Sequence, residues 1–148
     1  MLTKNKLNQK NLQPLSQAIS SFLAEEGYVA YEAYCAWRSI FRNIDAGIQG
    51  KALHDFWMPE DGGCYCLCKE ERDLDGSRVY TAYQLWIDPK LRSLAKVRRL
   101  VRFLRFYAQK QGYAKLVVIS SRVDKIRAYA RGLGKRFEVK NVVFVDEF

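Results

Sequence analysis

Four basic side chains gather just after the dipeptide Asp88-Pro89, where a helical pattern begins: Arg92, Lys96, Arg98 and Arg99. The first turn of a helix carries backbone N–H groups without intrahelical acceptors and the positive end of the helix dipole, and both attract anions. Arginine and lysine add charge-assisted hydrogen bonds to phosphate oxygens. We therefore predict that the amides opening this helix form an anion cradle.

Positive charge is concentrated in the same half of the chain. The 148 residues carry a net charge of +9, but residues 1–89 hold nine Lys/Arg against twelve Asp/Glu, whereas residues 90–148 hold sixteen against four. Such asymmetry favours a polyanionic partner: nucleic acid, an acidic protein surface, or the phosphates of a nucleotide-like cofactor. Arginines available for such a partner outside the cradle are Arg99, Arg102, Arg105, Arg127 and Arg131.

Three interpretations of this basic set stay open. It could form a solvent-exposed face, which is the usual case for a run of charges. It could instead bind the phosphates of a cofactor. It could also bind nucleic acid, with an affinity that falls steeply as salt is raised. No recognised nucleic-acid-binding motif is present in the sequence. A net charge of +12 over residues 90–148 is more than a cofactor alone requires.

Three cysteines alternate along one short segment: Cys64, Cys66 and Cys68. On a strand their thiols would share one face, about 6.6 Å apart. Zinc sites favour a C-x2–4-C spacing and a second ligand pair elsewhere, and only Cys35 or His54 could add a fourth ligand. We expect no metal site, and we interpret the cysteines as reduced, small core residues.

His54 is the only histidine of the chain, and its side chain titrates near neutral pH. It could act as a general base, but no partner for it is visible beside Trp57. A loop or packing role is the simpler interpretation.

Apolar periodicity and turn residues predict the elements that position these groups. Asp75-Gly76 is a strong hairpin signal between two strands, and the segment 50–61 has no regular pattern. The expected elements are a helix from Leu15 to Gly27, a helix over 32–48, strands over 64–68 and 78–87, a helix over 93–111, a strand over 116–120 covered on both faces, a helix over 123–132 and a strand over 137–145.

This order predicts an α/β chain whose second half contains a parallel crossover. Its length fits one domain, over 13–148, preceded by a flexible basic lead-in over 1–12. The sequence has no apolar run of about 18 residues and no apolar signal-peptide core at its beginning. We therefore expect a cytoplasmic protein.

The run from Leu85 to Leu104 resembles the core segment of the GNAT acyltransferase superfamily. In that family a strand ends in a V-x-P-like step, followed by a [QR]-x-x-G-x-[GA] loop that opens a long helix. A further strand and an N-x-x-A-x-x-x-Y-like helix come next. Asp88-Pro89, Arg92, Gly112 and Tyr129 fall in that order, and the similarity of pattern covers residues 12–145. It implies a GNAT-like fold, with a central mixed sheet flanked by helices that ends one strand short.

The resemblance also implies a function, which is transfer of an acetyl group from acetyl-CoA to an amine. Trp86 and Ile87 would pair with the pantetheine arm, and Tyr129 would protonate the leaving thiolate. The residues that would hold the pyrophosphate are Arg92, Ala95, Lys96, Val97 and Arg98.

Several departures from the family pattern leave an alternative open. Ala95 and Val97 occupy the positions of the two glycines of the family's loop. A valine would place a branched side chain where the family leaves the backbone uncovered. The strand over 78–87 has no carboxylate to act as a base, since Gln84 cannot serve as one. The Gly-Phe pair that follows the family's tyrosine is out of register after Tyr129, and the C-terminus lacks a turn for a full hairpin.

The alternative is a catalytically degenerate GNAT-like module that binds a polyanion or a protein partner through residues 90–136. A weaker similarity, to the small internal virion proteins of short-tailed phages, points the same way and implies that the protein could be associated with a virion. The short C-terminus would leave a sheet edge, which a homodimer or a larger assembly would cover.

Overall fold

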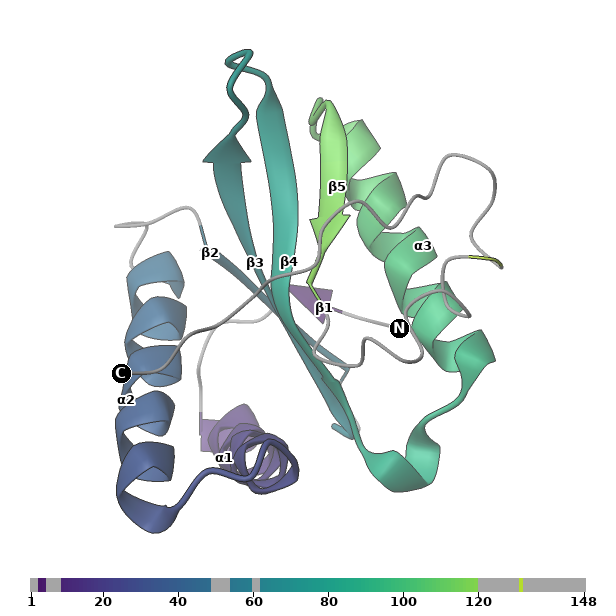
Figure 1. Cartoon of the computed structure of the whole chain (residues 1–148). Helices are drawn as coiled ribbons and strands as arrows, with labels where there is room; N and C mark the ends of the chain where they lie inside the picture. The colour runs from purple at the N-terminus through teal and green to yellow at the C-terminus, as the bar shows by residue number, and fades with distance from the viewer. Residues whose placement is uncertain (1–2, 5–8, 49–53, 60–61, 120–130, 132–148) are drawn as a thin grey trace.

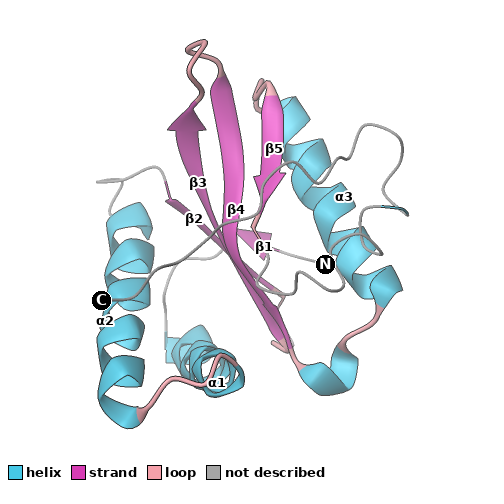
Figure 2. Cartoon of the chain, viewed as in Figure 1, coloured by secondary structure: helices cyan, strands magenta, loops and turns pink. Residues whose placement is uncertain are grey.

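A mixed sheet separates two helices on one face from a third helix on the other (Figure 1; Figure 2). The computed structural model describes residues 3–4, 9–48, 54–59, 62–119 and 131. In these residues the strand order is β1-β2-β3-β4-β5; the β4–β5 pair is parallel and the other pairs are antiparallel. The elements are β1 Thr3–Lys4, α1 Gln9–Glu25, α2 Ala30–Ile48, β2 His54–Met58, β3 Cys64–Arg72, β4 Arg78–Ile87, the 3-10 helix η1 Pro89–Leu91, α3 Leu94–Lys110 and β5 Lys115–Val118.

On one face, α1 packs against the sheet through residues spaced one helical turn apart. Leu15, Ile19 and Leu23 are buried in a cluster with side chains from the centre of the sheet, including Tyr65 and Trp86. The helix ends where Gly27 takes a positive φ of 78°, a conformation that favours glycine. The amide of Tyr28 then donates to the carbonyl of Leu23 and closes the last turn.

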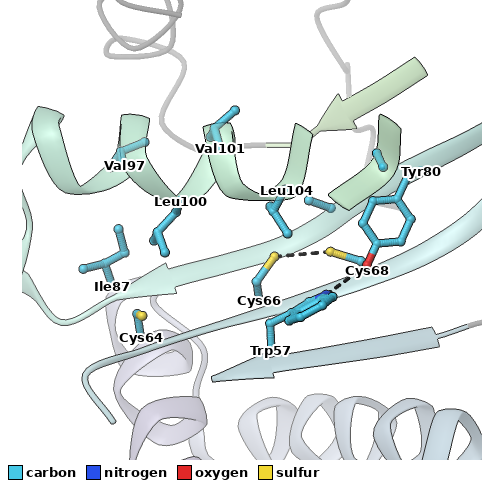
Figure 3. Close-up of a cluster of buried hydrophobic side chains, with 12 residues drawn as sticks. Trp57, Cys64, Cys66, Cys68, Tyr80, Ile87, Val97, Leu100, Val101 and Leu104 are labelled. Carbon is cyan, nitrogen blue, oxygen red and sulfur yellow. Dashed lines mark hydrogen bonds between the residues drawn. The ribbon is translucent and has the colours of Figure 1, made fainter. Parts of the chain in front are cut away.

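On the other face, α3 covers the alternating cysteines of β3 (Figure 3). Successive strand residues point to opposite faces, so Cys64, Cys66 and Cys68 meet α3 while Tyr65 and Leu67 meet the other layer. The α3 residues packed on them are Val97, Leu100, Val101, Leu104 and Ala108. All three cysteines are buried, so their prediction as small core residues is confirmed.

Several sequence predictions hold closely. The strand β4 has the predicted bounds, and Asp75-Gly76 lies in the turn before it, with Gly76 at φ 79°. α3 begins one residue after Ser93, and Gly112 follows its end at φ 76°. The α/β class and the parallel crossover from β4 through α3 to β5 are confirmed.

Two predictions about irregular segments need correction. The segment 50–61, expected to be irregular, contains β2, whose residues Phe56, Trp57 and Met58 are all buried. Because both faces of β2 are covered, its sequence shows no alternation that would reveal a strand. The lead-in over 1–12 is partly structured: Thr3 and Lys4 pair with Met58 and Trp57, and α1 begins at Gln9 rather than Leu15.

The second half of the crossover also differs from expectation. β5 is short, and Val117 and Ile119 are exposed, so the strand is not covered on both faces as predicted. The helix predicted over 123–132 and the strand over 137–145 lie outside the described residues, apart from Arg131, which is helical and exposed. Among the helices described here, none has the length and apolarity needed to cross a membrane.

Candidate functional site

The parallel strands β4 and β5 pair over only the first half of β4. Their register runs from Val79 with Lys115 to Ala82 with Val118, and the Ile119 amide donates to the Ala82 carbonyl at 2.9 Å. Beyond that point, no strand within the described ranges pairs with this side of β4. Among the residues that the structure describes, the two strands are therefore not joined along the second half of β4, which is what a cradle between them requires.

A β-bulge marks the same point of β4. Leu67 of β3 pairs with Gln84, but the next residue, Cys68, pairs with Ala82, so Tyr83 is extra. A bulge bends its strand and shifts which edge each backbone group faces. Here it coincides with the end of the parallel ladder.

The bulge determines which backbone groups of β4 face its open edge, meaning the side of the second half of β4 that β5 does not cover. Before the bulge, the carbonyl of Ala82, an even-numbered residue, faces β5. After the bulge, the amide of Asp88, also even-numbered, faces the other way and donates to the Gly63 carbonyl on the β3 side at 2.8 Å. Backbone groups of alternate residues point to opposite edges. The N–H and C=O groups of Leu85 and Ile87 therefore face the edge that β5 leaves uncovered.

The side chains of Trp86 and Ile87 hold this edge in place from within the core. Trp86 is 5% exposed, lies on the α1 face and stacks near Tyr65, with ring centroids 6.1 Å apart. Ile87 is 3% exposed and belongs to the cluster under α3. Ile87 can offer a ligand only its backbone on this edge, because its side chain is packed in the core. The backbone of Trp86, by the same alternation, faces β3.

The connection from β4 to α3 is fixed by two side-chain caps. The Asp88 carboxylate accepts the Lys90 amide at 2.9 Å and caps η1. The Ser93 hydroxyl accepts the Lys96 amide at 3.1 Å and is the N-cap of α3. A serine directly before a helical pattern is a recognised start signal, but sequence analysis did not single Ser93 out.

Arg92 lies at the end of the open edge and is held there by α1. Its Nη2 donates to the Ile87 carbonyl at 2.7 Å and to the two carboxylate oxygens of Glu25 at 3.0 and 3.1 Å. The Trp86 indole N–H also donates to Glu25, at 3.0 Å. Arg92, for which we predict a phosphate-binding role, thus lies beside the start of α3, and its charge is balanced by a carboxylate 67 residues away in sequence.

The remaining predicted cradle residues divide into two groups. Ala95 is exposed and Lys96 half-buried on the first turn of α3, and Arg98, at the start of the next turn, is also half-buried. Val97 is 8% exposed and packs into the core beneath the helix. The expectation that Val97 forms a wall in the cradle is therefore wrong: at this helical position the side chain points to the sheet, away from the end of α3.

Other predicted site residues stay predictions. Tyr129 and Arg127 lie outside the part of the chain that the structure describes. Arg99 and Arg102 are exposed on α3, whereas Arg105 is half-buried. His54 is the first residue of β2.

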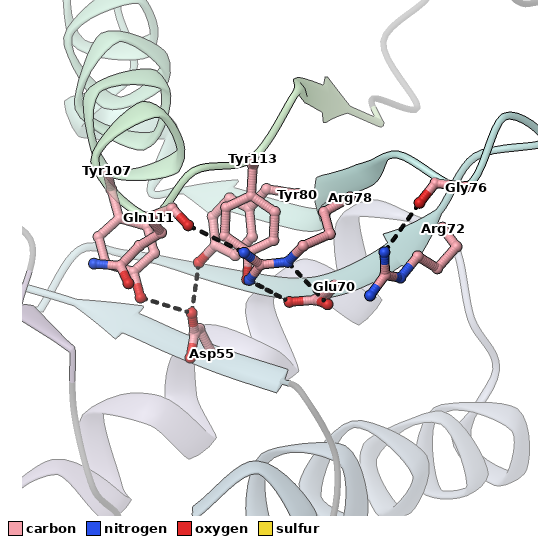
Figure 4. A network of polar contacts seen from close by, with 9 residues as sticks. All are labelled: Asp55, Glu70, Arg72, Gly76, Arg78, Tyr80, Tyr107, Gln111 and Tyr113. Carbon is pink, nitrogen blue, oxygen red and sulfur yellow. Dashed lines mark hydrogen bonds and ion pairs between the residues drawn. The ribbon is translucent and has the colours of Figure 1, made fainter.

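A polar network that sequence analysis did not predict lies near the start of β4, at the opposite end of this strand from Arg92 (Figure 4). The Tyr80 hydroxyl donates to Asp55 at 2.8 Å and accepts the Trp57 indole N–H at 2.9 Å. Burial raises the pKa of Tyr80 well above its usual range. Tyr80 is therefore a neutral hydrogen-bonding residue that joins β2 to β4.

Beside it, Glu70 joins β3 to β4 and to the end of α3. Arg78 pairs with Glu70 at 2.9 Å, and the Tyr113 hydroxyl donates to the same carboxylate at 2.9 Å. The Arg78 guanidinium and then the Tyr113 hydroxyl lower the pKa of Glu70. Arg78 also stacks over the Tyr113 ring, 4.4 Å from its centroid.

The cysteines under α3 form a close thiol pair. Cys66 Sγ lies 3.5 Å from Cys68 Sγ. Its hydrogen bond to Cys68, and then burial, raise the pKa of Cys66 well above the usual value. A protonated, buried thiol is a poor nucleophile and a poor metal ligand. Within the described residues, no three Cys, His, Asp or Glu side chains are arranged to hold a metal ion.

Comparisons with known proteins bear on the fold. No protein-family model matches the sequence, and no curated protein matches it significantly. A probable acetyltransferase of known structure superposes with a TM-score of 0.71 at 13% identity, over 99% of both chains.

Two further solved structures are aminoglycoside acetyltransferases. The aminoglycoside N-acetyltransferase AAC(6')-Iy, solved with CoA, has a TM-score of 0.64 at 13% identity, over 100% of this chain and 99% of that one. The enzyme meta-AAC0020 from an uncultured soil metagenomic sample, solved with sisomicin, has a TM-score of 0.68 at 14% identity, over 99% and 96%. At such identities the likeness shows the fold and not the reaction. The chain therefore has the fold of the GNAT acetyltransferases, a mixed sheet flanked by helices, as the resemblance in sequence predicts.

Proposed function

We propose that this protein is an N-acyltransferase that uses acetyl-CoA. The observation that supports it most is the open edge of β4, where the backbone groups of Leu85 and Ile87 lead to Arg92 and the start of α3. An extended amide-containing arm can pair with such an edge as a further strand would. A pyrophosphate at the far end of that arm would meet the amides and basic residues of the helix start.

The residues present fit acetyl-CoA at this position. The first turn of α3 has no acidic residue, and Ala95 is exposed there, which leaves only a methyl group in front of the helix end. Val97 points into the core and does not obstruct it. Arg92 would exchange Glu25 for phosphate oxygens, with which it forms charge-assisted hydrogen bonds of the same kind.

Acetyl-CoA supplies an activated acyl group, and the protein must position it, exclude competing contacts and manage two protons. Leu85 and Ile87 orient the arm through backbone hydrogen bonds, while Arg92, Lys96 and Arg98 hold the phosphates. Tyr129 is the proposed proton donor to the departing sulfur, as the resemblance implies. Glu25 is engaged by Arg92 and Trp86, so we assign it to holding Arg92 rather than to taking a proton.

A second candidate function is polyanion or protein binding by a module that has lost catalysis. The exposed side of α3 supports it, because Arg99, Arg102 and Phe106 are exposed along one stripe of the helix. The absence of a carboxylate on β4 also favours it. Cytoplasmic location, association with a virion and oligomeric state stay predictions.

Calorimetric titration with acetyl-CoA tests the first proposal. We expect binding in the micromolar to millimolar range, weakened at least fivefold in Arg92→Ala and in Lys96→Ala. Arg72→Ala is the matched control, since Arg72 lies at the hairpin end of β3 and donates to the Gly76 carbonyl. No heat with the wild-type protein at millimolar acetyl-CoA would overturn the proposal.

The same protein tests the second candidate. Binding to single- and double-stranded nucleic acid should weaken steeply as salt is raised, because neutralising phosphates releases counterions. A flat salt response would remove the nucleic-acid version of this candidate.

A further inference from the structure

The outward side of α3 carries more positive charge than its packing on the sheet requires. Of the 17 residues from Leu94 to Lys110, six are Lys or Arg and none is Asp or Glu. Like charges three or four residues apart on a helix repel one another, and Arg102 lies four residues after Arg98 and three before Arg105. An anion bound along the helix would relieve this repulsion.

Four exposed residues form one stripe along the helix, which we call the outer stripe: Arg99, Arg102, Phe106 and Lys110. Their spacing of three or four residues places them on one side of the helix. α3 packs on the sheet through the opposite side of the helix (Figure 1), so the outer stripe faces away from the sheet. At a rise of about 1.5 Å per residue, the stripe is about 16 Å long.

Phe106 is the one apolar member of the outer stripe. It is 66% exposed, whereas Phe103, on the same helix, packs against the core and meets Trp57 with ring centroids 5.2 Å apart. A single exposed apolar side chain is common on protein surfaces. Phe106, however, lies four residues from a cation on each side, Arg102 before it and Lys110 after it. The outer stripe therefore offers an aromatic ring between positive charges.

A single strand of nucleic acid has the two groups that such a stripe recognises. Its phosphates bind cations, and its unpaired bases stack on exposed aromatic rings. A duplex supplies the phosphates but keeps its bases stacked on one another inside the double helix, so it gives Phe106 no aromatic partner. Charge complementarity and the exposed ring together therefore favour a single strand.

We propose that the outer stripe binds single-stranded nucleic acid. Phe106 stacks on an unpaired base, while Arg99, Arg102 and Lys110 bind the phosphates on either side of that base. This inference rests on the second candidate function, to which it gives a partner. It holds whether or not the protein transfers acyl groups.

The proposed cofactor position and the outer stripe use different groups of the same helix. The phosphates of acetyl-CoA would lie at the first-turn amides of α3, beside Arg92 and Lys96. The outer stripe begins at Arg99, beyond the first turn, and faces away from the sheet. Phe106→Ala should therefore bind acetyl-CoA as the wild type does.

Fluorescence anisotropy with labelled oligonucleotides of about 15 residues tests this proposal. The probes are oligo(dT), oligo(U) and a duplex of the same length, so the first two also show whether DNA or RNA binds better. We expect the better single strand to bind about fivefold or more tightly than the duplex, with an affinity that falls steeply from about 50 to 200 mM salt. Binding of the duplex as tight as that of the better single strand would overturn the proposal.

Exposed positions separate stacking from charge. Phe106→Ala should weaken single-strand binding about fivefold or more, and Phe106→Tyr, which keeps the ring, should retain it. Leu74→Ala, which shortens an exposed apolar side chain in the β3–β4 turn, is the control. Arg99→Gln should lower the salt dependence by about one phosphate contact, and Arg42→Gln, at an exposed position on α2, should not. Unchanged binding in Phe106→Ala, or equal losses in Arg99→Gln and Arg42→Gln, would rule out the outer stripe as the site.

An anionic membrane is the main competing partner, since basic helices with exposed aromatic side chains also bind lipid surfaces. Sedimentation with phosphatidylserine vesicles that is lost in Phe106→Ala, in a protein that binds neither single strand, would overturn the proposal in favour of lipid. Binding of duplex and heparin without preference for a single strand would overturn this inference and leave polyanion binding in place. No binding to any of these polyanions at low salt would overturn the second candidate function as well, while acetyl-CoA titration decides acyl transfer separately.

Discussion

Arg92 Nη2 lies 2.7 Å from the carbonyl oxygen of Ile87 and donates to it. The same nitrogen contacts both carboxylate oxygens of Glu25, so the end of β4, the start of α3 and the end of α1 meet at one guanidinium. A bound phosphate would compete with Glu25 for this group. The strength of the Arg92–Glu25 pair therefore sets part of the affinity for any anion at α3.

Removing the charge of Glu25 should strengthen acetyl-CoA binding. Glu25→Gln keeps an acceptor for the Trp86 indole but frees the Arg92 charge, and we expect affinity at low salt to rise about threefold to tenfold, on the order of 1 kcal/mol. Calorimetry measures it. Glu26→Gln changes the net charge equally one residue away, and an equal gain there would show that Glu25 has no specific role.

How far the sequence predicts this structure depends on the range of the interactions involved. The bounds of β4 and α3 follow from local signals: Asp75-Gly76, Asp88-Pro89 and Gly112 each mark an end. The position of Arg92 follows from the small number of residues that separate it from those signals in the sequence.

Long-range relationships leave no such signal. Glu25 reaches Arg92 only because α1 crosses the end of β4, and nothing near Glu25 in sequence indicates this. The direction of Val97 depends on how α3 is rotated against the sheet, which loop similarity does not determine. The hydrogen bonds around Tyr80 and Asp55 join two strands and one helix, so their members become neighbours only in the fold.

Replacing Val97 should lower stability rather than improve the cradle. Val97→Gly removes buried methyl groups and adds glycine to a helix, and together these changes should cost about 3 kcal/mol in the free energy of unfolding. Ala95→Gly, at an exposed position, should cost about 1 kcal/mol or less. Urea denaturation compares the two. A Val97→Gly protein as stable as the wild type, with tighter acetyl-CoA binding, would show that the valine obstructs the cradle.

Tyr80→Phe should destabilise the protein through lost hydrogen bonds alone. The substitution removes the acceptor of the Trp57 indole N–H and one donor to the Asp55 carboxylate. We expect the free energy of unfolding to fall by about 2 kcal/mol. Tyr107→Phe is the comparison, since its hydroxyl is 3.4 Å from Asp55 and its loss should cost less than about 1 kcal/mol. Equal losses in the two variants would contradict the ranking. Unfolding followed by tryptophan fluorescence measures both.

Glu70 should contribute to the pH dependence of stability in acid. The pKa of Glu70 is lowered in the folded protein, mainly by its hydrogen bond to Arg78. Glu70 therefore contributes its full stabilisation of the fold above the unfolded pKa of about 4.3, and this stabilisation is lost as the pH falls through the folded pKa. The pair is partly exposed, so we expect less than about 1 kcal/mol. The difference in unfolding free energy between wild type and Glu70→Gln should be constant from pH 5 to 7 and shrink below pH 4. A difference that stays constant down to pH 3 would contradict this role.

Thiol reactivity tests the packing of α3 on β3. Cys35 is exposed on α2, while Cys64, Cys66 and Cys68 are buried, and the raised pKa of Cys66 keeps it protonated at neutral pH. A disulfide reagent such as dithiobis(nitrobenzoate) should therefore titrate one thiol per chain quickly in the native protein and all four in denaturant. Cys35→Ser should remove the fast reaction. Rapid reaction of a further thiol in the native Cys35→Ser protein would mean that α3 does not cover the cysteines as the structure shows, and the start of α3 would then not be fixed at the end of β4.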